Sequence, residues 1–157
     1  MEPIITRPDE ADIEAAALLG GEAWADIYAC YREELGDELF DAYMKGWKAR
    51  KIDGVRREMK SQNSWVTKLN GKVVGFIAYR VDGEYAEILG NAVSPDCRGM
   101  GLGKAQYLFV LDRMREEGAK YVSVTTGGDD GHAPARRAYE SVGFKAFTPS
   151  RTYRMKL

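Results

Sequence analysis

Asn91-Ala92-Val93-Ser94-Pro95-Asp96-Cys97-Arg98-Gly99-Met100-Gly101-Leu102-Gly103-Lys104 joins the end of an expected strand to the start of an expected helix through a glycine-rich loop. Glycine tolerates positive φ and lets the backbone approach a ligand closely. The free N–H groups of the first helical turn supply donors and a partial positive charge, and Arg98 and Lys104 add cationic side chains. This combination predicts a binding site for a pyrophosphate.

Two commoner phosphate-binding motifs do not fit this loop. The dinucleotide fingerprint G-x-G-x-x-G would need a glycine where Lys104 stands, and the P-loop G-x-x-x-x-G-K-[ST] would need a glycine at Arg98 and a hydroxyl at Ala105. The remaining pattern, Arg98-x-x-Gly101-x-Gly103, resembles the acetyl-CoA pyrophosphate loop of the GNAT superfamily of N-acetyltransferases. A plain strand-to-helix turn would have a similar composition, so the loop alone does not decide the matter.

A second motif lies downstream, at His132-x-x-Ala135-x-x-x-Tyr139-Glu140-x-x-Gly143-Phe144. It resembles the Asn-x-x-Ala-x-x-x-Tyr-x-x-x-Gly-Phe segment of the same family, with His132 where the family usually has asparagine. The spacing puts His132, Ala135 and Tyr139 on one side of a helix, along which a CoA arm can lie. Histidine can still donate one hydrogen bond at that position.

The resemblance implies that Tyr139 is the general acid that protonates the departing CoA thiolate. With an ordinary pKa of about 10, a tyrosine stays protonated at neutral pH and can pass its proton to a thiolate. Residue type alone would favour the alternative of a tyrosine packed in the core with its hydroxyl satisfied. The position of Tyr139 in the family motif favours the catalytic role.

A carboxylate interrupts an otherwise apolar strand at Tyr85-Ala86-Glu87-Ile88-Leu89-Gly90-Asn91-Ala92-Val93. The stretch resembles that of histone-acetylating GNAT enzymes, whose catalytic glutamate has the position of Glu87. An amine with a pKa of about 10.4 is almost fully protonated at neutral pH, so a base must remove its proton. Simple alternation puts Glu87 and Val93 on one face, although a bulge near Gly90 would alter that parity. A solvent-facing rim carboxylate is the alternative.

The resemblance further implies acetyl-CoA as the cosubstrate, without an acyl-enzyme. Trp24 and Tyr28 lie in a helical region that often borders the acceptor site in the family, but aromatic residues at helical spacing more often pack in a core. A nucleophilic Cys97 is disfavoured because the only histidine is distant in sequence. The implied CoA-binding residues are Ala92, Val93, Arg98, Gly99, Met100, Gly101, Leu102, Gly103, Lys104, His132 and Ala135.

Composition limits the alternatives. The 157 residues are the length of one domain, expected to span 1–157, and the net charge of -1 gives no field that attracts nucleic acid or a membrane. One histidine and two separated cysteines, Cys30 and Cys97, favour neither a metal site nor a disulfide framework. With no apolar leader and no long apolar run, we expect a cytoplasmic protein. Homodimers are common in the family and are one oligomeric state that the resemblance allows.

Periodicity and turn residues predict an α/β (α+β) fold in the order β-α-α-β-β-β-α-β-α-β-β, which matches the GNAT fold with its mixed, mostly antiparallel sheet flanked by helices. Asn70-Gly71 and Asp82-Gly83 mark hairpin turns, and Gly118 and Gly143 end helices. We expect strands at residues 3–7, 64–69, 72–81, 84–93, 121–126, 144–147 and 151–157. One helix is expected to begin at Asp9, and a second helical region to run from Trp24 past Gly36. Further helices are expected at 51–60, 101–117 and 134–141.

We therefore predict an N-acetyltransferase that moves an acetyl group from acetyl-CoA to a primary amine by direct attack, through a tetrahedral intermediate. The acceptor is a small-molecule or peptide amine that composition and motifs do not identify further. A CoA-binding sensor of the same fold, without turnover, is the alternative from another functional class. A third alternative is an acyltransferase that uses a longer acyl-CoA.

Overall fold

The computed structural model describes residues 2–61 and 63–157 and is built on one sheet with the strand order β1-β2-β3-β4-β5. The strands are β1 (Ile4–Thr6), β2 (Ser64–Leu69), β3 (Lys72–Asp82), β4 (Tyr85–Val93) and β5 (Tyr121–Val124). Neighbouring strands from β1 to β4 pair antiparallel, whereas β4 and β5 pair parallel. The mixed, mostly antiparallel sheet that the sequence predicts is confirmed.

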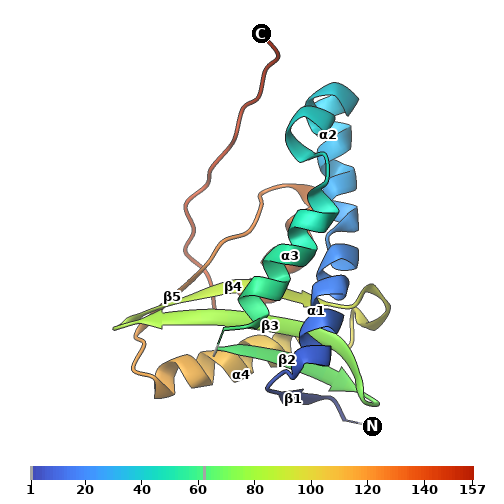
Figure 1. Cartoon of the computed structure of the whole chain (residues 1–157). Coiled ribbons are helices and arrows are strands. Elements are labelled where there is room, and N and C mark those ends of the chain that lie inside the picture. The colour runs from blue at the N-terminus through green and yellow to red at the C-terminus, as the bar shows by residue number, and fades with distance from the viewer. Residues whose placement is uncertain (1, 62) are drawn as a thin grey trace.

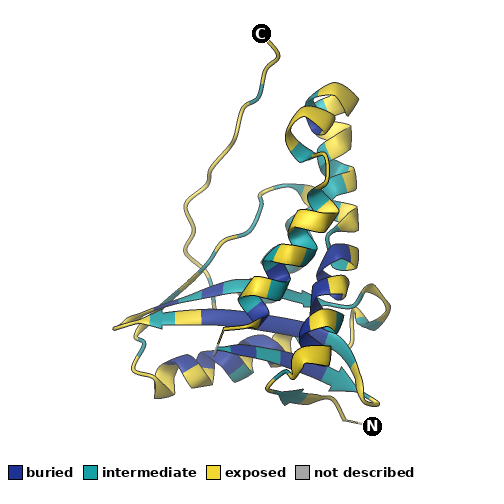
Figure 2. Cartoon of the chain, in the orientation of Figure 1, coloured by how far each residue is buried: buried dark blue, intermediate teal, exposed yellow. Residues whose placement is uncertain are grey.

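Helices cover both faces of this sheet (Figure 1). α1 (Glu10–Ala23) and α3 (Trp47–Met59) lie on one face and enclose a core that includes Ile13, Val55 and Phe76. α4 (Leu102–Glu116) and α5 (Ala133–Ser141) lie on the other face, where the core includes Tyr107 and Val110. Figure 2 shows the buried residues concentrated in the sheet and on the helix sides that face it. The sheet thus separates two hydrophobic cores.

Local sequence signals set several boundaries as expected. Asp9 and Asp12 form a capping box at the start of α1, in which the backbone N–H of Asp12 donates to Asp9 Oδ1 at 2.8 Å. Asn70 and Gly71 have φ values of 52° and 77°, as a type I′ turn between β2 and β3 requires. Gly118 has a φ of 93° just after α4, which fits its role in ending that helix.

The helical region that follows α1 differs from the expectation in where its last helix begins. α2 (Ala25–Met44) is interrupted at Gly36, where φ is 73° and ψ is 161°. α3 begins at Trp47, several residues before the expected start at Lys51, because Gly46 in the left-handed region provides the break between the helices. α2 extends away from the sheet, and Figure 2 shows it largely exposed. Among the described residues, no helix is long and apolar enough to cross a bilayer.

The two strands expected at 144–147 and 151–157 are wrong: residues 144–157 adopt no regular secondary structure, and β5 remains an edge of the sheet. A strand needs a neighbour for its backbone N–H and C=O groups, and this segment runs toward α2 and away from β5 (Figure 1). There Lys156 pairs with Glu38, and the Arg154 guanidinium lies 5.1 Å from the ring centroid of Tyr43. A strand-like side-chain pattern is therefore not sufficient to form a strand without a neighbour to pair with.

Candidate active site

The site is organised around the point where β4 separates from β5. Parallel pairing runs from Tyr85 with Tyr121 to Ile88 with Val124 and ends there. β4 continues to Val93, paired only with β3 among the described residues. The backbone of residues 89–93 that faces the β5 side thus has no strand partner within the described part of the chain. This opening exposes main-chain donors and acceptors between two strands.

A β-bulge in β4 decides which side chains face each core. Ile77 pairs with Asn91 and Tyr79 with Ile88, so β4 carries one extra residue around Leu89 and Gly90. Ala86 and Ile88 face the core under α4, so the intervening Glu87 faces the side of α1 and α3. Val93 instead lies on the α4 side, near Gly103. The bulge therefore puts Glu87 and Val93 on opposite faces, contrary to simple alternation.

Asn91 connects two tyrosines on the α4 and α5 face. The Tyr107 hydroxyl donates to Asn91 Oδ1 at 2.7 Å, and Asn91 Nδ2 donates to the Tyr139 hydroxyl oxygen at 3.1 Å. Burial raises the pKa of Tyr139 above its ordinary value, while the hydrogen bonds with Asn91 and Tyr107 act to lower that pKa. Burial likewise raises the pKa of Tyr107. Tyr139 is therefore protonated at neutral pH and fixed beside the end of β4.

The glycine loop has the backbone geometry that its composition predicts. Gly99 and Gly101 have φ values of 79° and 77°, in the region that favours glycine. Gly101 is the N-cap of α4 and no side chain caps the helix, so the N–H groups of its first turn remain free for a ligand. Met100, Leu102, Gly103 and Lys104 follow the same loop into α4, and Leu102 is buried.

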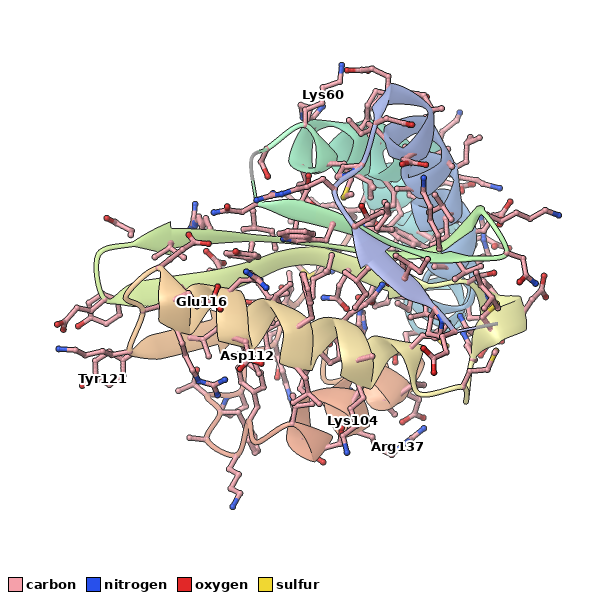
Figure 3. The ribbon with its side chains drawn as sticks, turned by 90° about the horizontal axis from the view of Figure 1, so that it is seen from below. Lys60, Lys104, Asp112, Glu116, Tyr121 and Arg137 are labelled. Atoms are coloured by element: carbon pink, nitrogen blue, oxygen red, sulfur yellow. The ribbon has the colours of Figure 1, made fainter. Side chains whose placement is uncertain are left out.

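Arg98 points away from this loop toward α2. Its Nη1 lies 3.1 Å from Asp26 Oδ2, and both side chains are largely exposed. An anion at the loop would compete with Asp26 for the guanidinium, since such an exposed pair contributes little stability. Figure 3 labels Lys104 at the start of α4 and Arg137 on α5, two further cationic residues of this half of the molecule.

His132 is engaged by a neighbouring carboxylate. The short helix η2 (Asp130–His132) precedes α5, and His132 Nδ1 lies 2.7 Å from Asp129 Oδ1. A side chain at Gly127 would overlap with both groups, so glycine is required there for space. Nδ1 of His132 is thus occupied by Asp129, and Nε2 is the ring nitrogen that remains for a ligand.

Thr126 supplies an unsatisfied polar group near the opening. It lies two residues beyond the end of β5, and its Oγ1 is buried without a hydrogen-bond partner among the described residues. Buried hydroxyls usually have a partner, so a polar ligand between β4 and β5 would satisfy this one. Ala135 is half-buried and packs on the core beneath α5, on the same helix as Tyr139.

Two glutamates lie on the opposite face from Tyr139. Glu87 pairs with Arg80 of β3, with 2.5 Å between its Oε2 and Nη2. Glu58 of α3 lies against β4 at Gly90, where a side chain would overlap with its carboxylate. Burial raises the pKa of Glu58. No sequence motif indicates Glu58, because its proximity to Gly90 depends on how α3 packs on the sheet.

The aromatic residues proposed to border the acceptor lie between the helices. Trp24 is half-buried at the junction of α1 and α2 and packs on the core, and Tyr28 stacks on Trp47 with ring centroids 4.0 Å apart. Tyr31 approaches His132 at a centroid distance of 6.2 Å, which links α2 to the loop before α5. These contacts favour packing for Tyr28, whereas Trp24 also contacts Lys51.

Comparison with known proteins identifies the family. The model of the acetyltransferase (GNAT) family matches residues 22–144. The chain belongs to the GNAT family of acetyltransferases. The match includes the glycine loop, β4 and α5 of this GNAT protein.

Relatives of this GNAT protein differ in what their names describe. Mycothiol acetyltransferase of Thermobispora bispora is 35% identical over 91 residues, which are 54% of this chain and 30% of that protein. The chain thus spans less than a third of the curated mycothiol acetyltransferases it matches. The PaiA N-acetyltransferase of Thermoplasma acidophilum, solved in complex with coenzyme A, has a TM-score of 0.72 at 17% identity, over 96% of this chain and 94% of that one.

The ribosomal-protein-S18-alanine N-acetyltransferase of Escherichia coli has a TM-score of 0.67 at 20% identity, over 94% of this chain and 80% of that one. At these identities the structural likeness shows the fold, and the GNAT fold expected from the sequence is confirmed. The names of these proteins refer to mycothiol and to a ribosomal protein, so family membership does not fix the acceptor.

Proposed function

We propose that this GNAT protein transfers an acetyl group from acetyl-CoA to a primary amine. The observation that carries the proposal is the opening between β4 and β5, beside which Asn91 holds the protonated Tyr139 hydroxyl at 3.1 Å. A strand with free backbone groups on one side can bind an extended ligand through main-chain hydrogen bonds. A fixed proton donor at the end of that ligand suits the release of a thiolate.

The residues present fit a CoA molecule. The uncapped first turn of α4, with Gly99 and Gly101 at positive φ, suits the pyrophosphate, and Arg98 and Lys104 supply positive charge. The β4 backbone at Ala92 and Val93 and the unpartnered Thr126 hydroxyl suit the amides of the pantetheine arm. His132 and Ala135 border the same arm in this proposal. Bound acetyl-CoA supplies an acetyl group activated as a thioester.

The proposed chemistry uses groups on both faces of β4. Glu87 accepts the proton of the amine, directly or through a water molecule, from the α3 side. Tyr139 protonates the departing sulfur from the α5 side. A main-chain N–H near Ala92 and Val93 stabilises the developing negative charge on the carbonyl oxygen, which lowers the barrier because that bond strengthens in the transition state.

The proposal is tested by thiol release from acetyl-CoA over a panel of amino acids, polyamines, aminoglycosides and peptides. We expect acceptor-dependent release of free CoA with at least one primary amine. Binding of CoA without release over the whole panel would contradict the transferase and favour a sensor. Faster release from propionyl- or succinyl-CoA than from acetyl-CoA would instead assign a longer acyl donor.

Replacing Arg98 with alanine is expected to weaken CoA binding by about 10-fold at low salt, because one charge-assisted contact to phosphate is lost. The effect should shrink as salt screens the interaction. Asp26→Asn should leave binding equal or tighter, since it frees Arg98 from its 3.1 Å partner. Isothermal titration with CoA measures both. Arg115→Ala, on the far end of α4 beside Asp112, is the control, and equal affinities for all variants would refute the phosphate role.

Replacing Glu87 with glutamine is expected to lower kcat by about 10-fold or more, because the amide cannot accept a proton. The acid limb of the pH profile of kcat/KM should flatten in the same variant. Arg80→Gln, which removes the ion-pair partner but keeps the carboxylate, should retain most activity. A Glu87→Gln enzyme with a normal rate and an unchanged acid limb would mean that another group is the base.

A further inference from the structure

The sheet-facing side of α3 carries two opposite charges, Lys51 and Glu58, that form no direct ion pair with any residue the structure describes. Lys51 and Glu58 are both half-buried, and neither forms an ion pair within 4.0 Å among residues 2–61 and 63–157. They lie seven positions apart, two helical turns, so they share one side of α3. Arg56 on the same helix is instead paired with Glu14 and Asp53. Half-buried charges without a partner are costly, which suggests that a ligand pairs with them.

Glu58 lies next to the proposed reaction centre. Its carboxylate is in contact with β4 at Gly90, whose missing side chain leaves the room for it. Gly90 belongs to the bulge and follows Ile88, the last residue of β4 that pairs with β5. Glu58 therefore occupies the α3 side of the opening whose other side is bordered by Tyr139. An ammonium group bound to Glu58 would be close to a thioester held along β4.

Lys51 lies further toward the start of α3. Its Nζ is 4.0 Å from the ring centroid of Trp24, a cation–π contact that leaves the ammonium without an anionic partner. Burial lowers the pKa of Lys51 and raises that of Glu58, while the attraction between the two charges opposes both shifts. The two groups thus interact across a distance too long for a direct ion pair.

We propose that Glu58 and Lys51 bind the acceptor as a zwitterion, so that the acceptor is an amino acid with a free carboxylate near its reacting amine. The ammonium group pairs with Glu58 and the carboxylate with Lys51. In an α-amino acid the two charged groups lie about 3 Å apart. With a hydrogen bond of about 2.8 Å at each end, the ligand spans roughly 8–9 Å, which is less than the rise of about 10.5 Å between the backbone positions of Lys51 and Glu58.

Charge distinguishes this acceptor from others. A polyamine would bring a second positive charge toward Lys51, which is repulsive at a half-buried site. A peptide lysine has no carboxylate near its amine. In this scheme Glu58 and Lys51 bind the acceptor, and Glu87 removes the proton. The inference rests on the proposed acetyl transfer and adds the class of acceptor.

The test compares free amino acids with their carboxamides as acceptors, by thiol release from acetyl-CoA. The amide keeps the amine and loses only the negative charge. We expect the parent enzyme to favour the acid by at least about 10-fold in kcat/KM, the effect of one charged hydrogen bond. Lys51→Met should abolish this preference by raising KM for the acid alone, and Lys51→Arg should retain it. Glu58→Gln should raise KM for both acceptors.

Two exposed residues provide matched controls. The first control is Lys60→Met, at the C-cap of α3, and the second is Glu116→Gln, at the last residue of α4; Figure 3 labels both residues. Both variants should keep the preference for the acid. Equal turnover of acid and amide by the parent, or a preference that survives Lys51→Met, would overturn the inference. Thiol release with polyamines or peptides but not with amino acids would overturn it while leaving the proposed transferase intact; no release with any amine would overturn both.

Discussion

Replacing Tyr139 with phenylalanine is expected to lower kcat by about 10-fold or more, because general-acid catalysis typically contributes 10² to 10⁴. The substitution removes the hydroxyl that accepts the hydrogen bond from Asn91 Nδ2 at 3.1 Å. The ring should remain in place, since it packs against Tyr107 and Phe144 with centroid distances of 5.1 Å and 5.9 Å. CoA affinity should therefore change little. Steady-state kinetics and calorimetry separate the two effects.

The raised pKa of Tyr139 adds a pH criterion. Because burial keeps this hydroxyl protonated above its ordinary range, the parent rate should show no alkaline loss from Tyr139 below a pH of about 10. Tyr121→Phe, an exposed tyrosine at the sheet edge that Figure 3 labels, is the matched control and should be fully active. An unchanged kcat in Tyr139→Phe would remove this residue from the chemistry.

Replacing Phe76 with alanine is expected to lower the free energy of unfolding by about 3–5 kcal/mol. Phe76 is 0% exposed in β3 and lies in the core between the sheet and α1 and α3. It also supports the site, because its ring lies 3.5 Å from where a side chain at Gly90 would be. The cost has two parts: lost burial of the ring and the cavity left in a rigid core.

Urea denaturation followed by circular dichroism measures this change. The midpoint should fall strongly with little change in slope, as for a variant that alters stability but not the extent of unfolding. Ile4→Ala, at a position that is 63% exposed in β1, should change stability by less than about 0.5 kcal/mol. A similarly small loss for Phe76→Ala would mean that the core collapses around the deletion or that Phe76 does not support it.

Local chemistry predicted most of the elements near the site. The hairpin at Asn70-Gly71, the Asp9 cap and the glycine loop before α4 each depend on a few adjacent residues. Such signals act over one turn, so they can be read without knowing the partners. The sequence allows a bulge near Gly90 that would alter the alternation of side chains along β4. The structure contains this bulge, and it puts Glu87 and Val93 on opposite faces of the sheet. The C-terminal strands failed because pairing needs an available neighbour.

The amino-acid sequence by itself determined the family, the order of the strands from β1 to β5, and the positions of the glycine loop and Tyr139, because these follow from turn chemistry, periodicity and short motifs. Only the tertiary structure decided that Asn91 joins Tyr107 to Tyr139 and that Glu58 meets β4 at Gly90. Such contacts depend on how helices dock on a twisted sheet. That docking is set by the packing of both cores, which no local segment specifies.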